Sequence, residues 1–231
     1  DVLEVYFAGG EIIITPEHYE CLDYWIENGQ NENIELTYTT NLSTLKGYKD
    51  KDLIELWSHF KNKVQLYASI DHYGERAEWM RKGTDWLETI ENRRRMMKEV
   101  PHVDFYVSST ISSMNVLHVL DFHKEWVEEG LINAKDWNVN ICQSPDWYRA
   151  DIFPEWFKRD CITPAYEEHI AWLLPQDILK RATTGYQSLI NLMKGNDASQ
   201  HWPRFIDETS KLDNVRNENF FETFSEFKDL K

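Results

Sequence analysis

Short apolar runs rich in β-branched and aromatic residues recur along the chain, and each is followed by a segment with helical periodicity. The strand-like runs cover residues 2–7, 34–40, 64–70, 103–111 and 137–143. The helical segments between them cover residues 15–29, 49–60, 84–100 and 115–131. Strands joined through helices must run parallel, because a short hairpin cannot return the chain in the same direction. The pattern therefore predicts an α/β fold in which helices cover a parallel sheet, as an open sheet or a barrel.

Residues suited to helix capping precede several of these helical segments. Thr15 followed by Pro16 is typical of a helix N-terminus, since proline is tolerated at the first helical position. Thr84 and Asn115 are predicted to cap two later helices, because their side-chain oxygens accept hydrogen bonds from free backbone N–H groups.

The alternation of strands and helices stops after residue 145. Residues 164–195 read as helices interrupted by Pro175, and a further helix and an acidic tail follow. We therefore expect an α/β core over residues 1–145 and a helical C-terminal extension over residues 146–231. The tail carries phenylalanines spaced for one helical face, which predicts a docking surface: Phe220, Phe221, Phe224 and Phe227.

The net charge limits the possible partners. The 231 residues include 40 acidic and 25 basic side chains, giving a formal charge of −15 that repels phosphate backbones and anionic lipids. No apolar stretch approaches the roughly 20 residues that span a bilayer, and no signal segment opens the chain. We expect a cytoplasmic protein without direct nucleic-acid or membrane partners. Cys21, Cys142 and Cys161 are odd in number and widely separated, so neither a disulfide framework nor a zinc site is indicated.

Polar residues follow every predicted strand. Carboxyl ends of parallel strands meet at one edge of a sheet, so these residues are candidates for a shared site. The alternative at each position is that a polar residue merely ends the strand. The stretch "VYFAGGEIII" at residues 5–14 has two interpretations. Its glycines can provide a tight turn, or they can let a ligand approach the backbone while Glu11 faces a cation such as an ammonium.

Several of these segments together resemble the radical S-adenosylmethionine enzymes. "VYFAGGEIII" resembles that family's second strand with its GGE motif, and "IELTYTTNLS" looks like the third strand ending in Thr-Asn. "VQLYASIDHYGERAEWMRKGTDWLETIEN" is similar to the fourth strand with Ser-x-Asp, and "VDFYVSSTISSMNVLHVLDFHKEWVEEG" resembles the fifth. All four occur in the family's order and at its spacing over residues 1–145. The resemblance implies a partial (β/α) barrel with parallel strands, incomplete at its N-terminal edge, that binds S-adenosylmethionine.

The resemblance also implies how the methionyl end of that cofactor would be held. Gly9, Gly10 and Glu11 would take the ammonium through backbone carbonyls and the carboxylate, which offer several acceptors to its N–H donors. Ser69 and Arg81 would hold the carboxylate, since a guanidinium fork matches its geometry. For Arg81 the alternative is an ordinary solvated charge in the run "ERAEWMRKG".

Weaker roles follow for residues near the same strand ends. The resemblance implies that Thr40 and Asn41 line the pocket and that Asp71 supports the loop. It further implies that Ser109 reaches the ribose and that Ile141 packs on the adenine. No residue receives a catalytic role, and none is expected to ligate a metal.

The chain departs from the family at one decisive point. The family binds a four-iron four-sulfur cluster through a CxxxCxxC loop, and this sequence contains no such motif. Without the cluster no electron source exists for reductive cleavage to a deoxyadenosyl radical, so the chain as given is expected to be chemically silent. Either the cluster-binding segment precedes Asp1 and the chain is a fragment, or the domain is a non-catalytic module that binds a partner or a small amino acid-like ligand.

The C-terminal region raises the question of an auxiliary cluster. Many relatives carry a cysteine-rich extension called SPASM or, when shorter, twitch. Beyond residue 145 this chain has Cys161 alone, so an auxiliary cluster is not expected. "FIDETSKLDNVRNENFFETFSEF" nevertheless resembles the closing segment of some twitch relatives, which are often phage-encoded. No substrate follows from it.

Overall fold

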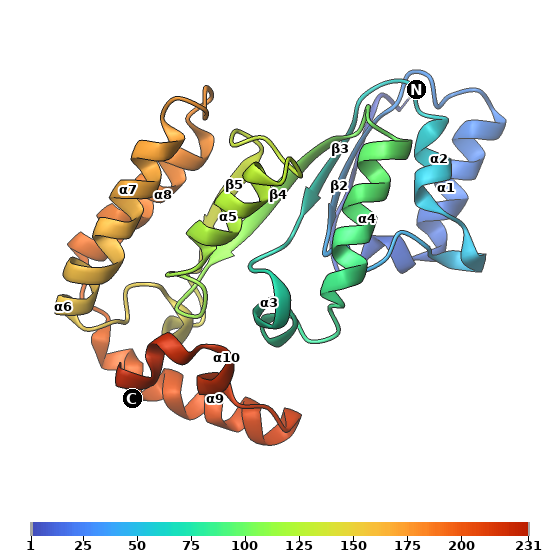
Figure 1. Cartoon of the computed structure of the whole chain (residues 1–231). Coiled ribbons are helices and arrows are strands. Elements are labelled where there is room, and N and C mark those ends of the chain that lie inside the picture. The colour runs from blue at the N-terminus through green and yellow to red at the C-terminus, as the bar shows by residue number, and fades with distance from the viewer. Residues whose placement is uncertain (1, 231) are drawn as a thin grey trace. The chain divides into compact units, whose positions relative to one another are not determined.

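The computed structural model describes residues 2–230 and contains a parallel sheet with its strands in sequence order, β1-β2-β3-β4-β5 (Figure 1). The strands are β1 (Glu4–Phe7), β2 (Glu35–Thr40), β3 (Val64–Ala68), β4 (Asp104–Ile111) and β5 (Trp137–Ile141). Each lies within a run predicted from the sequence. The parallel register pairs Val5 with Leu36 and Leu36 with Val64. The predicted α/β fold, with parallel strands and a helical C-terminal part, is confirmed.

Helices connect the strands and predominate in the chain after β5. They are α1 (Pro16–Glu27), α2 (Leu53–Ser58), α3 (Gly74–Met80), α4 (Trp86–Glu99), α5 (Val119–Glu128), α6 (Glu155–Phe157), α7 (Thr163–Leu173), α8 (Arg181–Gly195), α9 (Trp202–Arg216) and α10 (Phe220–Thr223). Among residues 2–230 no helix is both long and apolar enough to cross a membrane.

The structure corrects three expectations about the helices. Helix α3 lies where the sequence indicated only a polar connection. Asp85, not Thr84, caps α4, because its carboxylate accepts the Glu88 N–H at 3.0 Å. Helix α5 begins at Val119 after His118, so Asn115 is not its cap.

The described chain divides into two compact units. Unit 1 comprises residues 2–70 and 83–108, and unit 2 comprises residues 71–82 and 109–230. Helices α1, α2 and α4 belong to unit 1, and the other helices belong to unit 2. The predicted boundary between residues 145 and 146 remains a prediction.

In unit 1 the helices cover one face of the sheet (Figure 1). Burial alternates along β2 and β3, since successive side chains of a strand point to opposite faces. Leu36, Tyr38 and Leu66 are fully buried, together with Tyr19 of α1 and Trp57 of α2. This apolar layer holds the strand ends in place.

The other face of the sheet in unit 1 is only half-buried. It carries polar and aromatic side chains, including Thr39, Tyr67 and Tyr106. The rings of Tyr67 and Tyr106 stack 5.0 Å apart, and the Tyr6 hydroxyl bonds the Thr39 hydroxyl at 2.9 Å. Parallel sheets are usually covered on both faces, so this surface is unusual for such a sheet.

In unit 2, helix α8 packs directly against β5. A Cβ added to Gly185 would lie 2.4 Å from the Val139 Cβ, closer than such atoms approach in proteins. Next to this contact the His123 and Trp137 rings stack 4.3 Å apart, and Tyr186 is fully buried. Glycine at position 185 is therefore needed for the close approach of α8 to the sheet.

Substitution of this glycine is expected to destabilise the protein. In Gly185→Ala the new methyl group overlaps Val139, so the free energy of unfolding should fall by about 1–3 kcal/mol despite the better helix propensity of alanine. Gly195→Ala is the matched control, because nothing lies within 4 Å of its added Cβ. Urea unfolding followed by circular dichroism measures both. Equal stability of the two variants would contradict the close packing.

The C-terminal segment of unit 2 packs against α3. Trp79 contacts the rings of Phe220 and Phe224 at 5.2 and 5.5 Å, and the Trp79 carbonyl accepts a hydrogen bond from Arg216 at 2.9 Å. Arg76 forms an ion pair with Glu226 at 2.9 Å. The predicted phenylalanine docking surface is therefore occupied by the chain's own helix.

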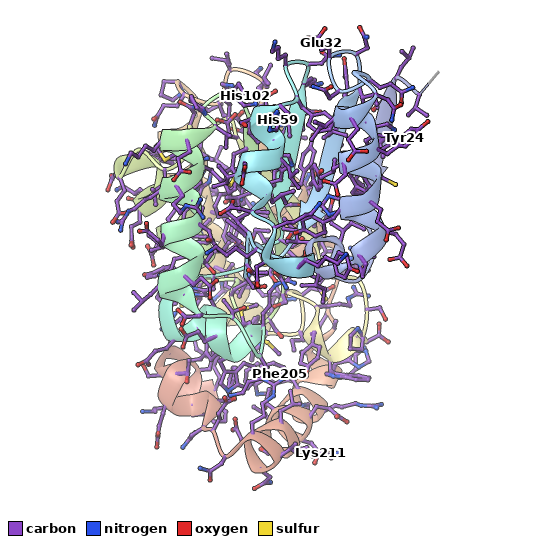
Figure 2. The ribbon with its side chains drawn as sticks, turned by 90° about the vertical axis from the view of Figure 1, so that its right-hand side faces the viewer. Tyr24, Glu32, His59, His102, Phe205 and Lys211 are labelled. Atoms are coloured by element: carbon purple, nitrogen blue, oxygen red, sulfur yellow. The ribbon has the colours of Figure 1, made fainter. Side chains whose placement is uncertain are left out.

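Helix α9 has one side packed against the C-terminal segment and one side exposed to solvent. Phe205 is fully buried against the C-terminal phenylalanines, whereas Lys211 extends into solvent (Figure 2). A further ion pair joins Lys82 to Glu218. These contacts connect the end of the chain to the segment that carries Arg81.

Candidate functional site

The turn after β1 depends on its two glycines. Gly9 has φ +95° and Gly10 has φ +51°, in the left-handed region that favours glycine. Both are exposed, and a Cβ at either would meet nothing within 4 Å. Backbone conformation, not packing, therefore requires glycine here, and the turn leaves the backbone open to a ligand.

Glu11 joins this turn to the end of β2. Its Oε1 accepts hydrogen bonds from the Thr40 hydroxyl at 2.6 Å and from the Ile13 N–H at 3.4 Å, and its Oε2 accepts the Asn41 N–H at 2.9 Å. Glu11 also caps the short 3₁₀ helix Ile12–Ile14. The structure thus brings Glu11, Thr40 and Asn41 together, and their role toward a cofactor stays a prediction. A carboxylate has about four acceptor positions, so Oε2 can still accept from a ligand.

Ser69 lies beside the same group. Its N–H donates to the Thr40 carbonyl at 2.7 Å, so the end of β3 is fixed to the end of β2. The residue is half-buried, and its hydroxyl has no hydrogen-bond partner among residues 2–230. Unit 1 therefore presents a fixed carboxylate and a free hydroxyl at adjacent strand ends.

Arg81 and Asp71 form an ion pair in unit 2. Arg81 ends α3, and its Nε donates to Asp71 Oδ2 at 2.8 Å. The Arg81 side chain is 39% exposed, and its Nη atoms have no partner within the described part of the chain. Asp71 thus orients the guanidinium while leaving the Nη edge free, and two N–H groups on that edge suit a carboxylate.

Asn115 holds the loop that carries Asp71. Its Nδ2 donates to the carbonyls of Asp71 at 2.8 Å and Thr110 at 3.1 Å, and its Oδ1 accepts the Ser112 N–H at 2.8 Å. The Thr110 N–H in turn donates to Asp71 Oδ1 at 2.7 Å. Asn115 is fully buried and was missed as a site residue, because its sequence context suggests only a helix cap.

Two weaker candidates are also in unit 2. Ser109 is fully buried, and its hydroxyl has no hydrogen-bond partner in the described chain. Ile141 is half-buried at the end of β5. Their roles toward a ribose and an adenine stay predictions.

The predicted site residues are divided between the two units. Those in unit 1 are Gly9, Gly10, Glu11, Thr40, Asn41 and Ser69. Those in unit 2 are Asp71, Arg81, Ser109 and Ile141. Within unit 1, hydrogen bonds from Thr40 and Asn41 fix the Glu11 carboxylate. Within unit 2, the Asp71 carboxylate fixes the Arg81 guanidinium.

The cysteines do not fit an iron–sulfur cluster. Cys21 and Cys161 are exposed, and Cys142 is half-buried. Burial raises the pKa of the Cys142 thiol, and the Asp71 carboxylate adds to this, whereas cluster ligation needs thiolates. Among residues 2–230 no three His, Cys, Asp or Glu side chains are grouped as metal ligands.

Comparison with known proteins gives two structural similarities. No protein-family model and no curated protein matches the chain. Hexahistidine-tagged anSMEcpe with bound AdoMet (S-adenosylmethionine) is similar at 20% identity over 74% of this chain and 43% of that one, with a TM-score of 0.48. Native anSMEcpe with bound AdoMet and the Cp18Cys peptide is similar at 19% identity over 74% of this chain and 45% of that one, also with a TM-score of 0.48. The chain spans less than half the length of either structure, so function has to rest on its own residues.

Proposed function

We propose that this chain binds S-adenosylmethionine through the methionyl end of the cofactor. The observation that carries the proposal is Glu11, a carboxylate fixed at the carboxyl ends of β1 and β2 next to two glycines with positive φ. Its remaining acceptor capacity and the open glycine backbone suit an ammonium. Thr40 and Asn41 keep the carboxylate oriented before a ligand arrives, which reduces the entropic cost of binding.

Arg81 supports the carboxylate half of the proposal. Its Nη edge is free while Asp71 fixes its Nε, so binding a carboxylate leaves that ion pair intact. The free hydroxyl of Ser69 adds a donor. These residue types match the ammonium and the carboxylate of an amino acid moiety.

Residues 1–231 provide the binding of the cofactor, whereas radical formation needs a cluster that these residues do not ligate. In the enzymes that the sequence resembles, a four-iron four-sulfur cluster supplies the electron for reductive cleavage of the cofactor. The cysteines of this chain do not fit that cluster. A radical enzyme whose cluster is ligated outside Asp1–Lys231 is one form of the proposal. The alternative is a non-catalytic α/β module that binds a partner or a small amino acid-like ligand.

Isothermal titration of the chain with S-adenosylmethionine tests the binding. Glu11→Gln and Arg81→Gln should each weaken binding by about 10- to 100-fold, as expected for one charge-assisted hydrogen bond. Decarboxylated S-adenosylmethionine separates the two roles: with it, Arg81→Gln should lose its effect and Glu11→Gln should keep it.

Two exposed residues provide the controls. Glu17→Gln and Arg94→Gln should bind as the parent does, and thermal melting of every variant verifies folding. No binding at millimolar cofactor, or unchanged affinity in Glu11→Gln, would refute the proposal. A second experiment separates the radical enzyme from the non-catalytic module. This chain and a chain extended beyond residues 1–231 are incubated anaerobically with iron and sulfide, and visible cluster absorbance in the extended chain supports the radical enzyme.

A further inference from the structure

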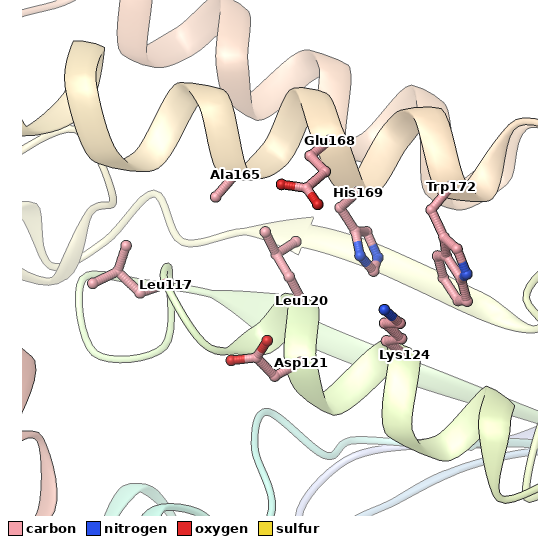
Figure 3. A pocket seen from close by; sticks show the side chains of 8 residues that line it. All are labelled: Leu117, Leu120, Asp121, Lys124, Ala165, Glu168, His169 and Trp172. Carbon is pink, nitrogen blue, oxygen red and sulfur yellow. The ribbon is translucent and has the colours of Figure 1, made fainter.

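Helices α5 and α7 border a cavity of about 190 Å³ within unit 2 that is open to solvent on one side, with the liquid volume of roughly six water molecules (Figure 3). The chain lines it with two stripes of residues, one from α5 and the turn before it, and one from α7. The first stripe is Leu117, Leu120, Asp121 and Lys124, and the second is Ala165, Glu168, His169 and Trp172. In both, the spacing is i, i+3, i+4 and i+7, which places all four side chains on one helical face.

One part of the cavity is acidic. Asp121 of α5 and Glu168 of α7 line this part from opposite helices, with Leu120 drawn between them (Figure 3). Asp121 Oδ2 lies 2.7 Å from His118 Nδ1, which leaves its second oxygen free. Glu168 has no hydrogen-bond or ion-pair partner among residues 2–230. Two carboxylates with free acceptor positions favour a cationic group between them.

The other part of the cavity offers a positive charge. Lys124 and His169 lie near each other there (Figure 3). Lys124 forms a long ion pair with Glu128, at 3.8 Å, in which both side chains are more than half exposed, so its ammonium can turn to a ligand. The ring of His169 is 7% exposed, and its Nε2 is engaged by His123 Nδ1 at 3.3 Å, which leaves Nδ1 toward the cavity. Burial lowers the pKa of His169 to about 4, so Lys124 alone supplies the positive charge at neutral pH.

Asp121 and Lys124 are three residues apart on α5, hence about one helical turn from each other. Opposite charges at that spacing match the ammonium and carboxylate of one small molecule. Leu120 and Trp172 add an apolar wall, and the indole face also suits a cation. An ammonium and a carboxylate on neighbouring atoms, with an apolar side chain beside them, describe a free α-amino acid.

We propose that this cavity binds a free amino acid with a small apolar side chain. Its ammonium lies between Asp121 and Glu168, its carboxylate is paired with Lys124, and its side chain lies against Leu120 and Trp172. The site uses none of the residues proposed to bind S-adenosylmethionine, so it is independent of that function.

Isothermal titration of the full chain with L-leucine tests the inference, with N-acetyl-L-leucine and isoamylamine as matched probes. L-Leucine should bind with a dissociation constant on the order of 1 mM. N-acetyl-L-leucine lacks the ammonium and isoamylamine lacks the carboxylate, so each should bind at least about tenfold more weakly. Equal binding of all three would overturn the assignment, as would no binding of L-leucine at concentrations of tens of millimolar.

Variants identify the site. Glu168→Gln and Lys124→Gln should each weaken L-leucine binding by about tenfold, and Lys124→Gln should leave isoamylamine binding unchanged. Glu129→Gln, at the end of α5 outside the cavity, is the matched control. Glu11→Gln should bind L-leucine normally, which separates failure here from failure of the cofactor proposal. L-Leucine binding that survives in Glu168→Gln and Lys124→Gln would overturn the inference.

Discussion

Acidification to about pH 5 is expected to lower the free energy of unfolding by several kcal/mol. His18, His72 and His169 are buried, and burial lowers their pKa values to about 4, about 3 and about 4. Because these values lie below that of an unfolded histidine, the unfolded state binds more protons as the pH falls below about 6.5. The contribution of these histidines to the free energy of unfolding is therefore fully present above about pH 6.5. It is lost as the pH falls toward the pKa values of the folded state. Each histidine contributes about 2 kcal/mol of this loss at pH 5.

A single substitution isolates one of these contributions. The Nε2 atom of His72 has no hydrogen-bond partner within residues 2–230, and its ring lies among Tyr73, Phe122 and Phe224. His72→Phe removes the acceptor of the Tyr73 N–H, which donates to His72 Nδ1 at 2.8 Å, so the stability near pH 7.5 should fall by about 1 kcal/mol. The further loss on going to about pH 5 should shrink by about 2 kcal/mol. Urea unfolding at both pH values measures the difference.

The control is His201, which is not buried. The variant His201→Gln should keep the full pH dependence of the parent. If His72→Phe and His201→Gln show the same loss of stability on acidification, the buried neutral state of His72 is wrong.

Asn115→Ala is expected to cost about 3–5 kcal/mol of the free energy of unfolding. The substitution removes the hydrogen bonds to the Asp71 and Thr110 carbonyls and to the Ser112 N–H. The Asp71 carbonyl and the Ser112 N–H would be left buried without these partners, at about 1–3 kcal/mol each, whereas the Thr110 carbonyl is only partly buried and adds less. Chemical denaturation measures the loss. Titration with S-adenosylmethionine should also show weaker binding, because the loop of Asp71 then no longer fixes Arg81.

Asn191→Ala on the exposed side of α8 is the matched control. Its side chain is exposed and accepts a hydrogen bond from the exposed Gln187 at 3.2 Å, so the expected change is below about 0.5 kcal/mol. A loss below about 1 kcal/mol in Asn115→Ala would mean that its hydrogen bonds do not hold the loop.

The sequence predicted the sheet well because its signals are local. Alternating apolar residues identified β2 and β4, and the turn chemistry of Gly9 and Gly10 marked the end of β1. Helix α3 was missed, since its seven residues show no regular apolar period. Thr84 and Asp85 are both good caps, and only the position of the first turn decides between them.

The candidate site was predictable in part. Glu11, Thr40 and Asn41 follow neighbouring parallel strands, so their proximity follows from topology. The pairing of Arg81 with Asp71 depends on how α3 bends back, which no local pattern encodes. The cavity between α5 and α7 was also beyond prediction, because each stripe reads as an ordinary amphipathic face until the partner helix is known.

Helix α3 and the turn after it are held by residues that lie 136 to 150 positions further along the chain. Trp79 contacts Arg216, Arg76 pairs with Glu226, and Lys82 pairs with Glu218. A ribosome adds roughly 5 to 20 residues per second, so α3 waits about 7 to 30 seconds for these anchors during synthesis. Arg81 therefore gains its final support only after residue 226 has been synthesised. A nascent chain stalled before residue 216 would expose Trp79 to chaperones and proteases.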